Sequence, residues 1–358
     1  MQFTVQQIAE AIGAEADGNT DLTIVRAAEP SDARPTDLAM AMSPKYAEAL
    51  SKGSARVAVL WQGADWRNLG LDAAIFVQRP RFAMSGITAM LDRGQGVELG
   101  IHPSAVIDST AEIASDVSIG PLVVVGARAK IGAGSVIGPH CVIGIDATLG
   151  QDAYLRESVS IGPRALIGDR FIAQPGARIG SDGFSFVTPE VSGVENVRKT
   201  LGDQGDAKQQ QWLRIHSLGA VEIGDDVEIG ANCTIDNGTI RNTYIGDGSK
   251  LDNQVHIGHN ARTGKDCLIC GQSGLSGSVV LGNNVVMGGQ SGASDNITIG
   301  DGVIAAGGTK MISNVPAGRV VMGYPSVKME THTEIYKAQR RLPRMARDVE
   351  ALKKAVFK

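Results

Sequence analysis

Aliphatic residues recur at every sixth position through much of the chain. A helix repeats every 3.6 residues and a strand every two, so a strict period of six indicates neither element alone. A hexapeptide repeat is instead the signature of a parallel β-helix, a solenoid of short strands wound round a packed axis. The first run has one lapse and comprises Ile101, Ile107, Ile113, Ile119, Val125, Ile131, Ile137, Ile143, Leu149, Leu155, Ile161, Ile167, Ala173 and Ile179.

The repeat resumes after an interruption, and its register then slips by four residues between Ile235 and Ile245. Three hexads make one triangular coil, so residues eighteen apart should stack on neighbouring coils about 4.8 Å apart, with the aliphatic residues inside. Thr263 is the one polar residue in the series. The second run comprises Ile223, Ile229 and Ile235, and then Ile245, Leu251, Ile257, Thr263, Ile269, Leu275, Leu281, Met287, Ala293, Ile299, Ala305 and Met311.

The pattern predicts a mainly β fold with three segments. Residues 1–98 form a small α/β domain, residues 99–320 a left-handed parallel β-helix, and residues 321–358 a helical C-terminal tail. Residues 181–216 carry no repeat and are rich in Gly, Asp, Gln and Lys, which indicates an excursion from the coil. Long excursions in compact domains are usually functional or disordered.

The first segment mixes helical and strand patterns. Val5, Ile8, Ala9 and Ile12 form one face of a helix that ends near Gly13. A second helix begins at Ser43-Pro44, with Ser43 as N-cap, and runs to about residue 50. Strands are expected at 22–25, 56–60 and 73–77, a further helix at 81–91, and a helical tail from about residue 330.

Composition excludes several classes of protein. Among 358 residues the formal net charge is only −4, so no overall nucleic-acid footprint is present. The sequence has neither an apolar run long enough to span a membrane nor a signal-peptide start, so we expect a cytoplasmic protein without stable membrane insertion. Cys267 and Cys270 have redox or zinc spacing, but the interpretation we favour for all four cysteines is reduced thiols that pack in the coil.

The C-terminal tail is basic although the whole chain is acidic. Beyond Glu330 it carries eight cations against three anions, which suits either a solvated surface or a docking element for an acidic partner. The cations are Lys337, Arg340, Arg341, Arg344, Arg347, Lys353, Lys354 and Lys358, and the anions are Glu334, Asp348 and Glu350.

The densest polar cluster within the repeat spans residues 251–260. His259 follows the inward Ile257 and a Gly corner, so its imidazole can leave the core and act as a general base near pH 7. Asp252 is the candidate to orient that ring. Gly277, eighteen residues on, should stack beside His259, where its N–H could stabilise an oxyanion. Two other interpretations are that His259 is a surface residue and that His256 and His259 bind zinc.

Four stretches of the chain resemble the motifs of one known family. They are Ser43-Pro44-Lys45-Tyr46, Gly180-Ser181-Asp182-Gly183-Phe184-Ser185-Phe186, residues 227–236 and residues 250–260, which resemble NPKY, GxDGFGF, VEIGANTTID and KLDN…IAHN. The family is the UDP-3-O-(3-hydroxyacyl)glucosamine N-acyltransferases of lipid A biosynthesis, and the resemblance covers nearly the whole chain in the right order.

The resemblance implies an architecture and a reaction. Family members have an N-terminal uridine-binding domain, a left-handed β-helix and C-terminal helices, and work as homotrimers with active sites between subunits. They move a 3-hydroxyacyl chain from acyl carrier protein to the 2-amino group of a UDP-sugar, without a metal or other cofactor. The basic tail would then dock the acidic carrier protein through Arg340, Arg341 and Arg344.

The resemblance also implies roles for individual residues. His259 falls on the general base and Asp252 on the Asp of LDN. The other expected contacts with substrate are Tyr46, which falls on the uridine-contacting Tyr, and Met40, Ser43, Asp182, Phe184, Asn253, Asn260 and His256. The sequence departs from the family pattern at Met40, Ser43, His256, Asn237 and Asn296, where many members have an aromatic residue, Asn, Gln, Arg and a second His.

Two alternatives to this assignment stay open on the sequence. One is another hexapeptide acyltransferase, either the O-acyltransferase one step earlier in the pathway or an acetyl-CoA-dependent sugar acetyltransferase. The N-terminal domain with its SPKY helix argues against the O-acyltransferase, which begins with its β-helix. The other is a solenoid scaffold that has lost its activity, for which Asn296 and Met40 would speak.

Overall fold

The computed structural model describes residues 2–200, 202–323 and 326–356. The chain divides into two compact units, Met1–Gly96 and Val97–Lys358, which are described separately here. Lys358, one of the cations counted in the tail, lies outside the described residues.

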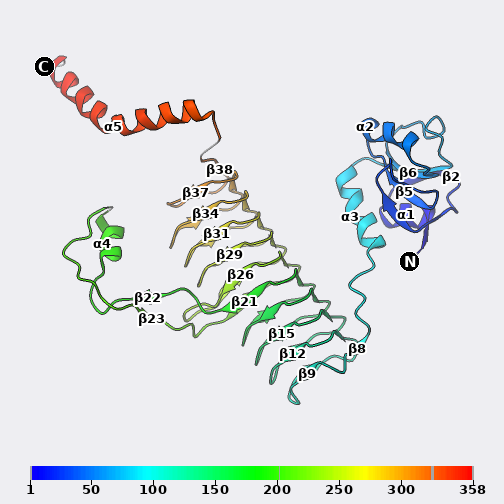
Figure 1. Ribbon diagram of the computed structural model, residues 1–358, viewed down its shortest axis with the longest axis horizontal. Coiled ribbons are helices and arrows are strands. Elements are labelled where there is room, and N and C mark those ends of the chain that lie inside the picture. Colours follow the sequence, from blue (N-terminus) through cyan, green and yellow to red (C-terminus); the bar gives the residue numbers. More distant parts are fainter. Residues whose placement is uncertain (1, 201, 324–325, 357–358) are drawn as a thin grey trace. The chain divides into compact units, whose positions relative to one another are not determined.

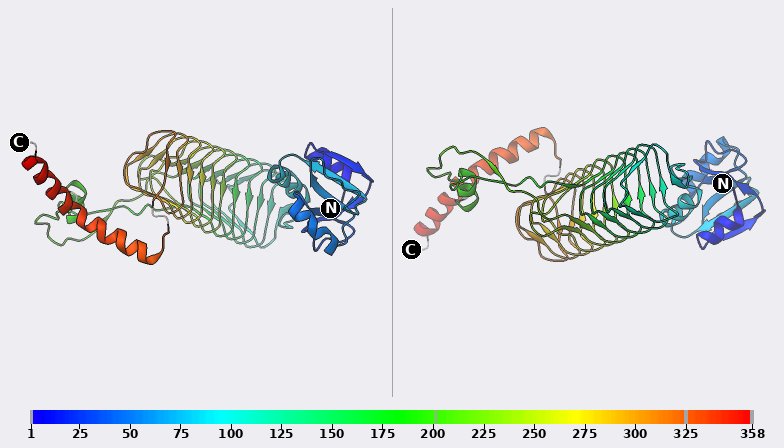
Figure 2. Two further views of the ribbon diagram at one scale, coloured as in Figure 1. Left: turned by 90° about the horizontal axis from the view of Figure 1, so that it is seen from above. Right: turned by 90° about the horizontal axis from the view of Figure 1, so that it is seen from below.

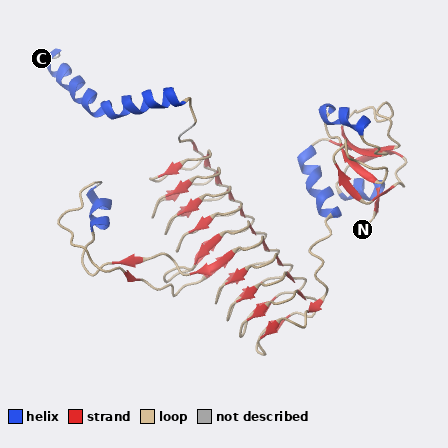
Figure 3. Cartoon of the chain, in the orientation of Figure 1, coloured by secondary structure: helices blue, strands red, loops and turns tan. Residues whose placement is uncertain are grey.

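The first unit is built on a five-stranded sheet (Figure 3). Strands β4 to β7 pair in parallel, while β2, at the edge opposite β4, runs antiparallel to β7. A separate antiparallel pair joins β1 (Phe3–Thr4) to β3 (Thr23–Ile24). In sheet order the strands are β2 (Glu15–Gly18), β7 (Ala73–Val77), β6 (Val57–Trp61), β5 (Asp37–Met40) and β4 (Arg26–Ala28).

The helices of this unit confirm the sequence-based expectations. Helix α1 (Val5–Ala11) is capped by Thr4, and its Val5, Ile8 and Ala9 are buried as the pattern predicts. Helices α2 (Pro44–Ala47), η1 (Glu48–Lys52) and α3 (Pro80–Leu91) follow. Ser43 occupies the N-cap position of α2 as predicted, although its side chain makes no capping hydrogen bond.

Strands β2, β4 and β5 are absent from the expectations. Each is three or four residues long, β2 is largely exposed and β4 is at most half-buried, so no apolar alternation distinguishes these two from loops. The buried Asp37 at the start of β5 accepts two hydrogen bonds from Arg26, at 3.0 and 2.7 Å, and one from the Arg34 N–H. This three-fold pairing allows a carboxylate to begin a buried strand.

The second unit is a parallel β-helix whose three faces are visible in Figure 1 and Figure 2. The first face comprises β8 (Gly100–Ile101), β11 (Ser118–Ile119), β14 (Val136–Ile137), β17 (Tyr154–Leu155), β20 (Ile172–Ala173), β25 (Glu228–Ile229), β28 (Lys250–Leu251), β30 (Leu268–Ile269), β33 (Val286–Met287), β36 (Ile304–Ala305) and β38 (Val320–Val321).

The second face carries the candidate site. It comprises β9 (Val106–Ile107), β12 (Val124–Val125), β15 (Val142–Ile143), β18 (Ser160–Ile161), β21 (Arg178–Ser181), β26 (Thr234–Asp236), β29 (His256–Ile257), β31 (Gly274–Leu275), β34 (Gly292–Ala293) and β37 (Lys310–Met311).

The third face is a six-stranded sheet followed by a two-stranded one, linked through isolated bridges at Arg262. The strands are β10 (Glu112–Ile113), β13 (Lys130–Ile131), β16 (Thr148–Leu149), β19 (Leu166–Ile167), β24 (Val221–Ile223) and β27 (Thr243–Ile245), and then β32 (Val280–Leu281) and β35 (Thr298–Ile299).

The register follows the expected stack of eighteen residues. Ile143 pairs with Ile161, and Leu275 pairs with Ala293. Across the four-residue slip the spacing widens to twenty-two, as between Ile235 and Ile257. The extra residues therefore leave the coil at a corner and do not disturb the file of inward side chains.

The interior confirms the inward assignment of the hexad series. From Ile119 onward its members are buried, and the Thr263 Oγ1 accepts the Gly246 N–H inside the coil at 3.0 Å. The first coil differs: Ile101 is 51% exposed and Ile107 and Ile113 are half-buried. No coil lies beneath them within this unit to cover that end.

Two elements leave the solenoid. The excursion contains β22 (Phe186–Val187), α4 (Gly193–Thr200) and β23 (Leu213–Arg214), and residues 182–218 are called the arm below. Helix α5 (Met329–Val356) forms the tail and has no buried side chain. The helical tail is thus confirmed, as one helix in which Pro343 is included.

Candidate active site

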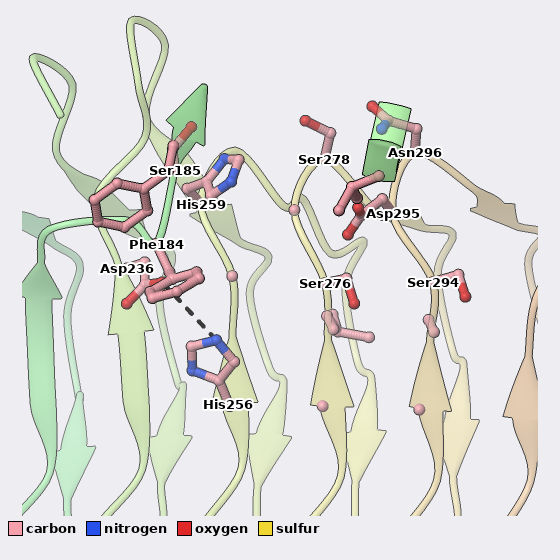
Figure 4. Close-up of a pocket in the computed structure, with 18 of the residues that line it drawn as sticks. Phe184, Ser185, Asp236, His256, His259, Ser276, Ser278, Ser294, Asp295 and Asn296 are labelled. Carbon is pink, nitrogen blue, oxygen red and sulfur yellow. Dashed lines mark ion pairs between the residues drawn. The ribbon is translucent and has the colours of Figure 1, made fainter. Parts of the chain in front are cut away.

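A groove of about 1,090 Å³ runs along the second face and is bordered by the arm. It lies on the coils that follow the arm in sequence, which are called the upper coils below. His256, His259, Gly277 and Asn296 line it, together with apolar side chains of the arm (Figure 4). The structure therefore brings together several residues that the sequence singled out, on strands β26, β29, β31 and β34 and the corners that follow them.

His259 stands between two glycines. A Cβ atom at Gly183 would lie 2.7 Å from the Cβ of His259, and one at Gly277 would lie 2.7 Å from its Cε1 and 2.8 Å from its Nε2. Any side chain at either position would displace the imidazole. Gly277 thus stacks beside His259 as the eighteen-residue spacing predicts, and Gly183 places the base of the arm against the same ring.

Asn260 determines which nitrogen of His259 is free. The Asn260 Oδ1 accepts the Thr239 N–H at 3.2 Å, and its Nδ2 donates to the Arg241 carbonyl at 3.3 Å, which fixes the orientation of the amide. The His259 Nδ1 lies 3.0 Å from that Oδ1 and must therefore carry the proton. The lone pair remains on Nε2, the atom beside Gly277.

His256 and Asp236 form a second polar pair in the groove. The His256 Nε2 lies 3.8 Å from the Asp236 Oδ2, and the His256 Nδ1 lies 2.8 Å from the Thr234 Oγ1 (Figure 4). Burial raises the pKa of Asp236 above its ordinary value, while the charges of His256 and His259 oppose that rise. Asp236 is only 6% exposed, so it is the buried carboxyl group closest to this chemistry.

Asp252 does not take the predicted orienting role within the chain. Its carboxylate accepts the N–H groups of Asn253 at 2.7 Å and Gly271 at 2.9 Å, and no contact with His259 occurs among the described residues. The reason is geometric, because one hexad carries the backbone from one corner of the triangle to the next. Asp252 and His259 therefore occupy different corners, and Asn260 holds the ring instead.

Asn253 shares the corner of Asp252 and is likewise structural within the chain. Its Oδ1 accepts the Ala231 N–H at 2.7 Å on the preceding coil. The same device recurs elsewhere, as where Asn283 accepts the Lys265 N–H at 2.9 Å. Gly277 occupies the equivalent corner position beside His259.

Missing side chains hollow the groove. The outward positions of the second face above His256 are Gly274 and Gly292, and a Cβ at Gly274 would have no atom closer than 3.9 Å. Lys310 closes this row and donates to the Gln290 carbonyl at 2.7 Å. The result is a trough with a histidine at one end and an ammonium group at the other.

The remaining predicted contacts are dispersed. Phe184 lines the groove and is 84% exposed, whereas Asp182 is exposed but does not line it. Met40, at the end of β5, and Ser43 and Tyr46, at α2, belong to the first unit, where Tyr46 is 55% exposed.

The positions that depart from the family pattern also have clear places. Asn296 lines the groove, and its N–H donates to the Gly277 carbonyl at 3.1 Å. Asn237 is buried, and its Nδ2 donates to the Gly180 carbonyl at 2.9 Å.

Sequence reasoning missed several groups that form the site. Asp236 is part of a quoted motif but was given no role, and Gly183, Gly274, Gly292 and Lys310 were not considered. Three of these, Gly274, Gly292 and Lys310, could have been found by listing the outward neighbours of the inward series on one face, since those positions stack in a file. Trp212 and Val194 of the arm carry no periodic signal that would place them at the groove.

Two searches of the described residues gave negative results. Within 2–200, 202–323 and 326–356, no three or more His, Cys, Asp or Glu residues are grouped so that they could hold a metal ion. Over the same ranges, none of the helices combines the length and apolar character needed to cross a membrane.

Comparison with known proteins identifies the family. Residues 110–145 match the bacterial transferase hexapeptide (six repeats) family. The chain is 75% identical over 358 residues to a UDP-3-O-acylglucosamine N-acyltransferase of Ruegeria pomeroyi, which covers 100% of this chain and 99% of the relative. The chain belongs to the UDP-3-O-acylglucosamine N-acyltransferase family. It is accordingly an acyltransferase, and the resemblance drawn from its motifs is confirmed.

Further relatives of the UDP-3-O-acylglucosamine N-acyltransferase family agree. The protein of that name from Paracoccus denitrificans is 58% identical over 358 residues, covering 100% of this chain and 98% of the relative. The one from Pseudomonas aeruginosa (strain LESB58) is 42% identical over 278 residues, covering 78% and 73%.

A solved structure shares the fold. The Arabidopsis UDP-N-acetylglucosamine acyltransferase matches with a TM-score of 0.50 and 22% identity, over 63% of this chain and 71% of that one. The predicted fold class, a left-handed parallel β-helix, is confirmed.

Proposed function

We propose that this acyltransferase moves a 3-hydroxyacyl chain from the thioester of acyl carrier protein to the 2-amino group of a UDP-3-O-acylglucosamine, a step of lipid A biosynthesis. The amine nitrogen attacks the thioester carbon, and the His259 Nε2 removes the proton that the nitrogen loses. The tetrahedral intermediate collapses, the C–S bond breaks, and the imidazolium returns its proton to the departing sulfur. An amide and a free carrier-protein thiol result.

The observation that carries this proposal is the setting of His259. Its Nδ1 is held by Asn260, so the Nε2 lone pair is the free base, and the Gly277 backbone lies beside it. A base and an oxyanion donor side by side are what acyl transfer to an amine requires. Because the thioester is already activated, the proposed reaction needs no metal, no other cofactor and no covalent enzyme intermediate.

The other substrate contacts are part of the same proposal. Phe184, His256 and Asn260 lie at or beside the groove and would contact the UDP-sugar or its acyl chain. Asp182 would contribute from the start of the arm. Tyr46, with Met40 and Ser43 nearby in sequence, would hold the uridine, and the half-exposed Tyr46 ring is open to stack on a base.

A homotrimer is the proposed assembly, as the resemblance implies. Outward side chains of the first face form an apolar file that the described residues of this unit leave exposed: Leu268 is 46%, Ile304 46% and Val320 75% exposed. Exposed apolar files of this kind mark contacts between proteins. In such an assembly Asp252 and Asn253, on the corner beside this file, would approach the groove of a neighbouring copy.

Helix α5 is the proposed docking element for the acidic carrier protein. Arg344 contacts only Asp348, at 3.8 Å, and Arg340 lies over the Tyr336 ring at 5.9 Å, so these cations have no strong partner among the described residues. Reversing the charges of Arg340, Arg341 and Arg344 should weaken carrier-protein binding, and high salt should abolish the difference from wild type. Binding that is indifferent to both changes would reduce α5 to a solvated surface.

A matrix of donors and acceptors tests the reaction. The full chain is incubated with 3-hydroxyacyl carrier protein or acetyl-CoA, and with UDP-3-O-acylglucosamine or UDP-N-acetylglucosamine, and the products are resolved by mass spectrometry. We expect an N-acylated product from the carrier-protein donor and the free-amine acceptor alone. Efficient use of acetyl-CoA, or O-acylation of UDP-N-acetylglucosamine, would contradict the proposal and favour another hexapeptide acyltransferase.

A further inference from the structure

The arm is a folded element that interrupts the solenoid between β21 and β24. Its two strands pair antiparallel, with Phe186 opposite Arg214 and Val187 opposite Leu213, and the Ile215 N–H donates to the Ser185 carbonyl at 2.9 Å. Its base is anchored to the site, because Gly183 packs on His259 and donates its N–H to the Ser217 Oγ at 2.9 Å. The arm is thus held at the catalytic end of the groove.

Polar groups at the far end of the arm satisfy one another. Ser192 caps α4: its Oγ accepts the Glu195 N–H at 3.2 Å, and the Glu195 carboxylate accepts the Ser192 N–H at 2.8 Å. The Thr188 Oγ1 donates to the Glu190 carbonyl at 2.6 Å, and the Glu190 N–H donates to the Gln210 Oε1 at 2.8 Å. The arm therefore has the internal bonding of a defined element.

Its apolar side chains, in contrast, form no core of their own. Val194 is 52%, Trp212 53% and Ile215 38% exposed, and all three line the groove that contains His259. The facing wall is the glycine-hollowed trough of the second face, which ends at Met311 and Ile312. The groove therefore has apolar side chains on both sides, between the histidines at one end and Lys310 at the other.

We propose that the arm is the outer wall of the acyl groove, and that Trp212 is a specificity-determining residue that packs on the hydrocarbon of the chain being transferred. This inference rests on the proposed function. The thioester carbonyl must lie at Gly277 and His259 to react, so the chain bonded to that carbonyl begins inside this groove. Of the parts of either substrate, an alkyl chain is the one whose contact with Val194, Trp212 and Ile215 would remove apolar surface from water on both sides and so favour binding.

The principal test compares Trp212→Ala with Leu213→Ala. Leu213 is the next residue of β23, is 47% exposed and does not line the groove, so its truncation controls for damage to the arm. Steady-state rates are measured with 3-hydroxyacyl carrier proteins of increasing chain length. For Trp212→Ala we expect kcat/KM to fall about tenfold with the donor that wild type prefers and little with the shortest donor. The KM for the UDP-sugar should not change.

The outcomes separate this inference from the proposed function. If wild type transfers no hydroxyacyl chain from any carrier-protein donor, both fall together. If wild type is active but Trp212→Ala loses rate equally with short and long donors, or behaves as Leu213→Ala does, only the role of the arm is overturned. Light scattering of the same variants adds a third check, since dissociation of the assembly caused by Trp212→Ala would mean that the arm packs on a second copy.

Fluorescence provides a readout that does not depend on turnover. The chain has three tryptophans, Trp61, Trp66 and Trp212, and subtraction of the Trp212→Phe spectrum isolates the third. Titration with 3-hydroxyacyl-pantetheine should shift the Trp212 emission to the blue, more strongly for longer chains, as water leaves the ring. An emission that does not respond at concentrations that inhibit the enzyme would contradict the proposed contact.

Discussion

The second face of the solenoid contains two stretches that share one interior and differ outside. In the coils that precede the arm in sequence, called the lower coils, the outward residues are Val106, Val124 and Val142, which are 64%, 41% and 41% exposed. In the upper coils the corresponding residues include His256, Gly274 and Gly292. The difference shows that, in this fold, inward positions set the coil while outward positions of the same strands set the chemistry.

The separation follows from the geometry of a two-residue strand. Successive side chains point to opposite sides, so each strand contributes one residue to the core and one to the surface. Because each coil contacts only its neighbours, outward residues can change without disturbing the stack. A few coils can then carry catalytic side chains at their outward positions. Substitutions at inward and outward positions should therefore affect stability and turnover separately.

The largest expected effect is on turnover. His259→Ala removes the base whose free Nε2 lone pair lies beside Gly277, and we expect kcat to fall by about 10²–10⁴-fold. The circular dichroism spectrum and the unfolding midpoint should not change, because the ring lies outside the core. Val142→Ala, an outward substitution on the lower coils of the same face, is the matched control and should leave turnover as it is. Near-normal turnover of His259→Ala would remove it as the base.

An inward substitution should have the opposite signature. Phe171 is the largest fully buried side chain and lies on the lower coils. Phe171→Ala should lower the free energy of unfolding by about 3–5 kcal/mol through lost burial and the cavity left behind. Denaturant unfolding measures the loss, while kcat at a temperature where the variant is folded should stay near that of wild type. A large fall in kcat with unchanged stability would contradict the assignment of stability to inward residues and of turnover to outward ones.

The inward threonine sharpens the boundary between the two roles. Thr263→Val keeps the shape of the residue but removes the hydroxyl that accepts the Gly246 N–H, leaving a buried donor unpaired. We expect a loss of about 1–3 kcal/mol in unfolding free energy. Thr298→Val, an exposed substitution on the third face, is the control and should be nearly neutral. Equal effects of the two substitutions would show that the inward hydroxyl contributes nothing.

The same positions explain which features of the fold and of the site could be predicted from the sequence. The period of six predicts the coils, the stacking of Gly277 on His259 and the inward Thr263, because each depends on counting residues along the chain. Asp252 was assigned to His259 because the two are near in sequence, yet one hexad separates their corners. Asn260 was expected to contact substrate, and its amide has a further role that was not expected, since it fixes the His259 tautomer through bonds to Thr239 and Arg241. These contacts join Asn260 to residues in the four-residue slip on the preceding coil, so the six-residue period does not predict them.

The smallest expected effect concerns two carboxyl groups whose pKa values move in opposite directions. Burial raises the pKa of Asp236, on the upper coils, above its ordinary value of 3.8. The folded chain therefore holds this proton more tightly than the unfolded chain does, so the stabilisation is present below pH 3.8 and is lost as the pH rises through the raised value. Asp236→Asn cannot titrate, and its unfolding midpoint relative to wild type should rise over that range, in which His256, His259 and Asp182 are the charged neighbours.

Asp146, on the lower coils, should behave in the reverse way. Its two carboxylate oxygens accept hydrogen bonds from Arg128 at 2.7 and 2.8 Å, and this pairing lowers the pKa of Asp146 below 3.8. A depressed folded pKa stabilises the fold above the ordinary value and ceases to do so as the pH falls through the depressed one. Calorimetry should therefore show that the unfolding midpoint of wild type relative to Asp146→Asn falls as the pH falls. The midpoint of Asp236→Asn relative to wild type should instead rise as the pH rises. Parallel slopes for the two variants would mean that the buried carboxyl of the groove is an ordinary surface charge, and that the upper coils differ from the lower ones in shape alone.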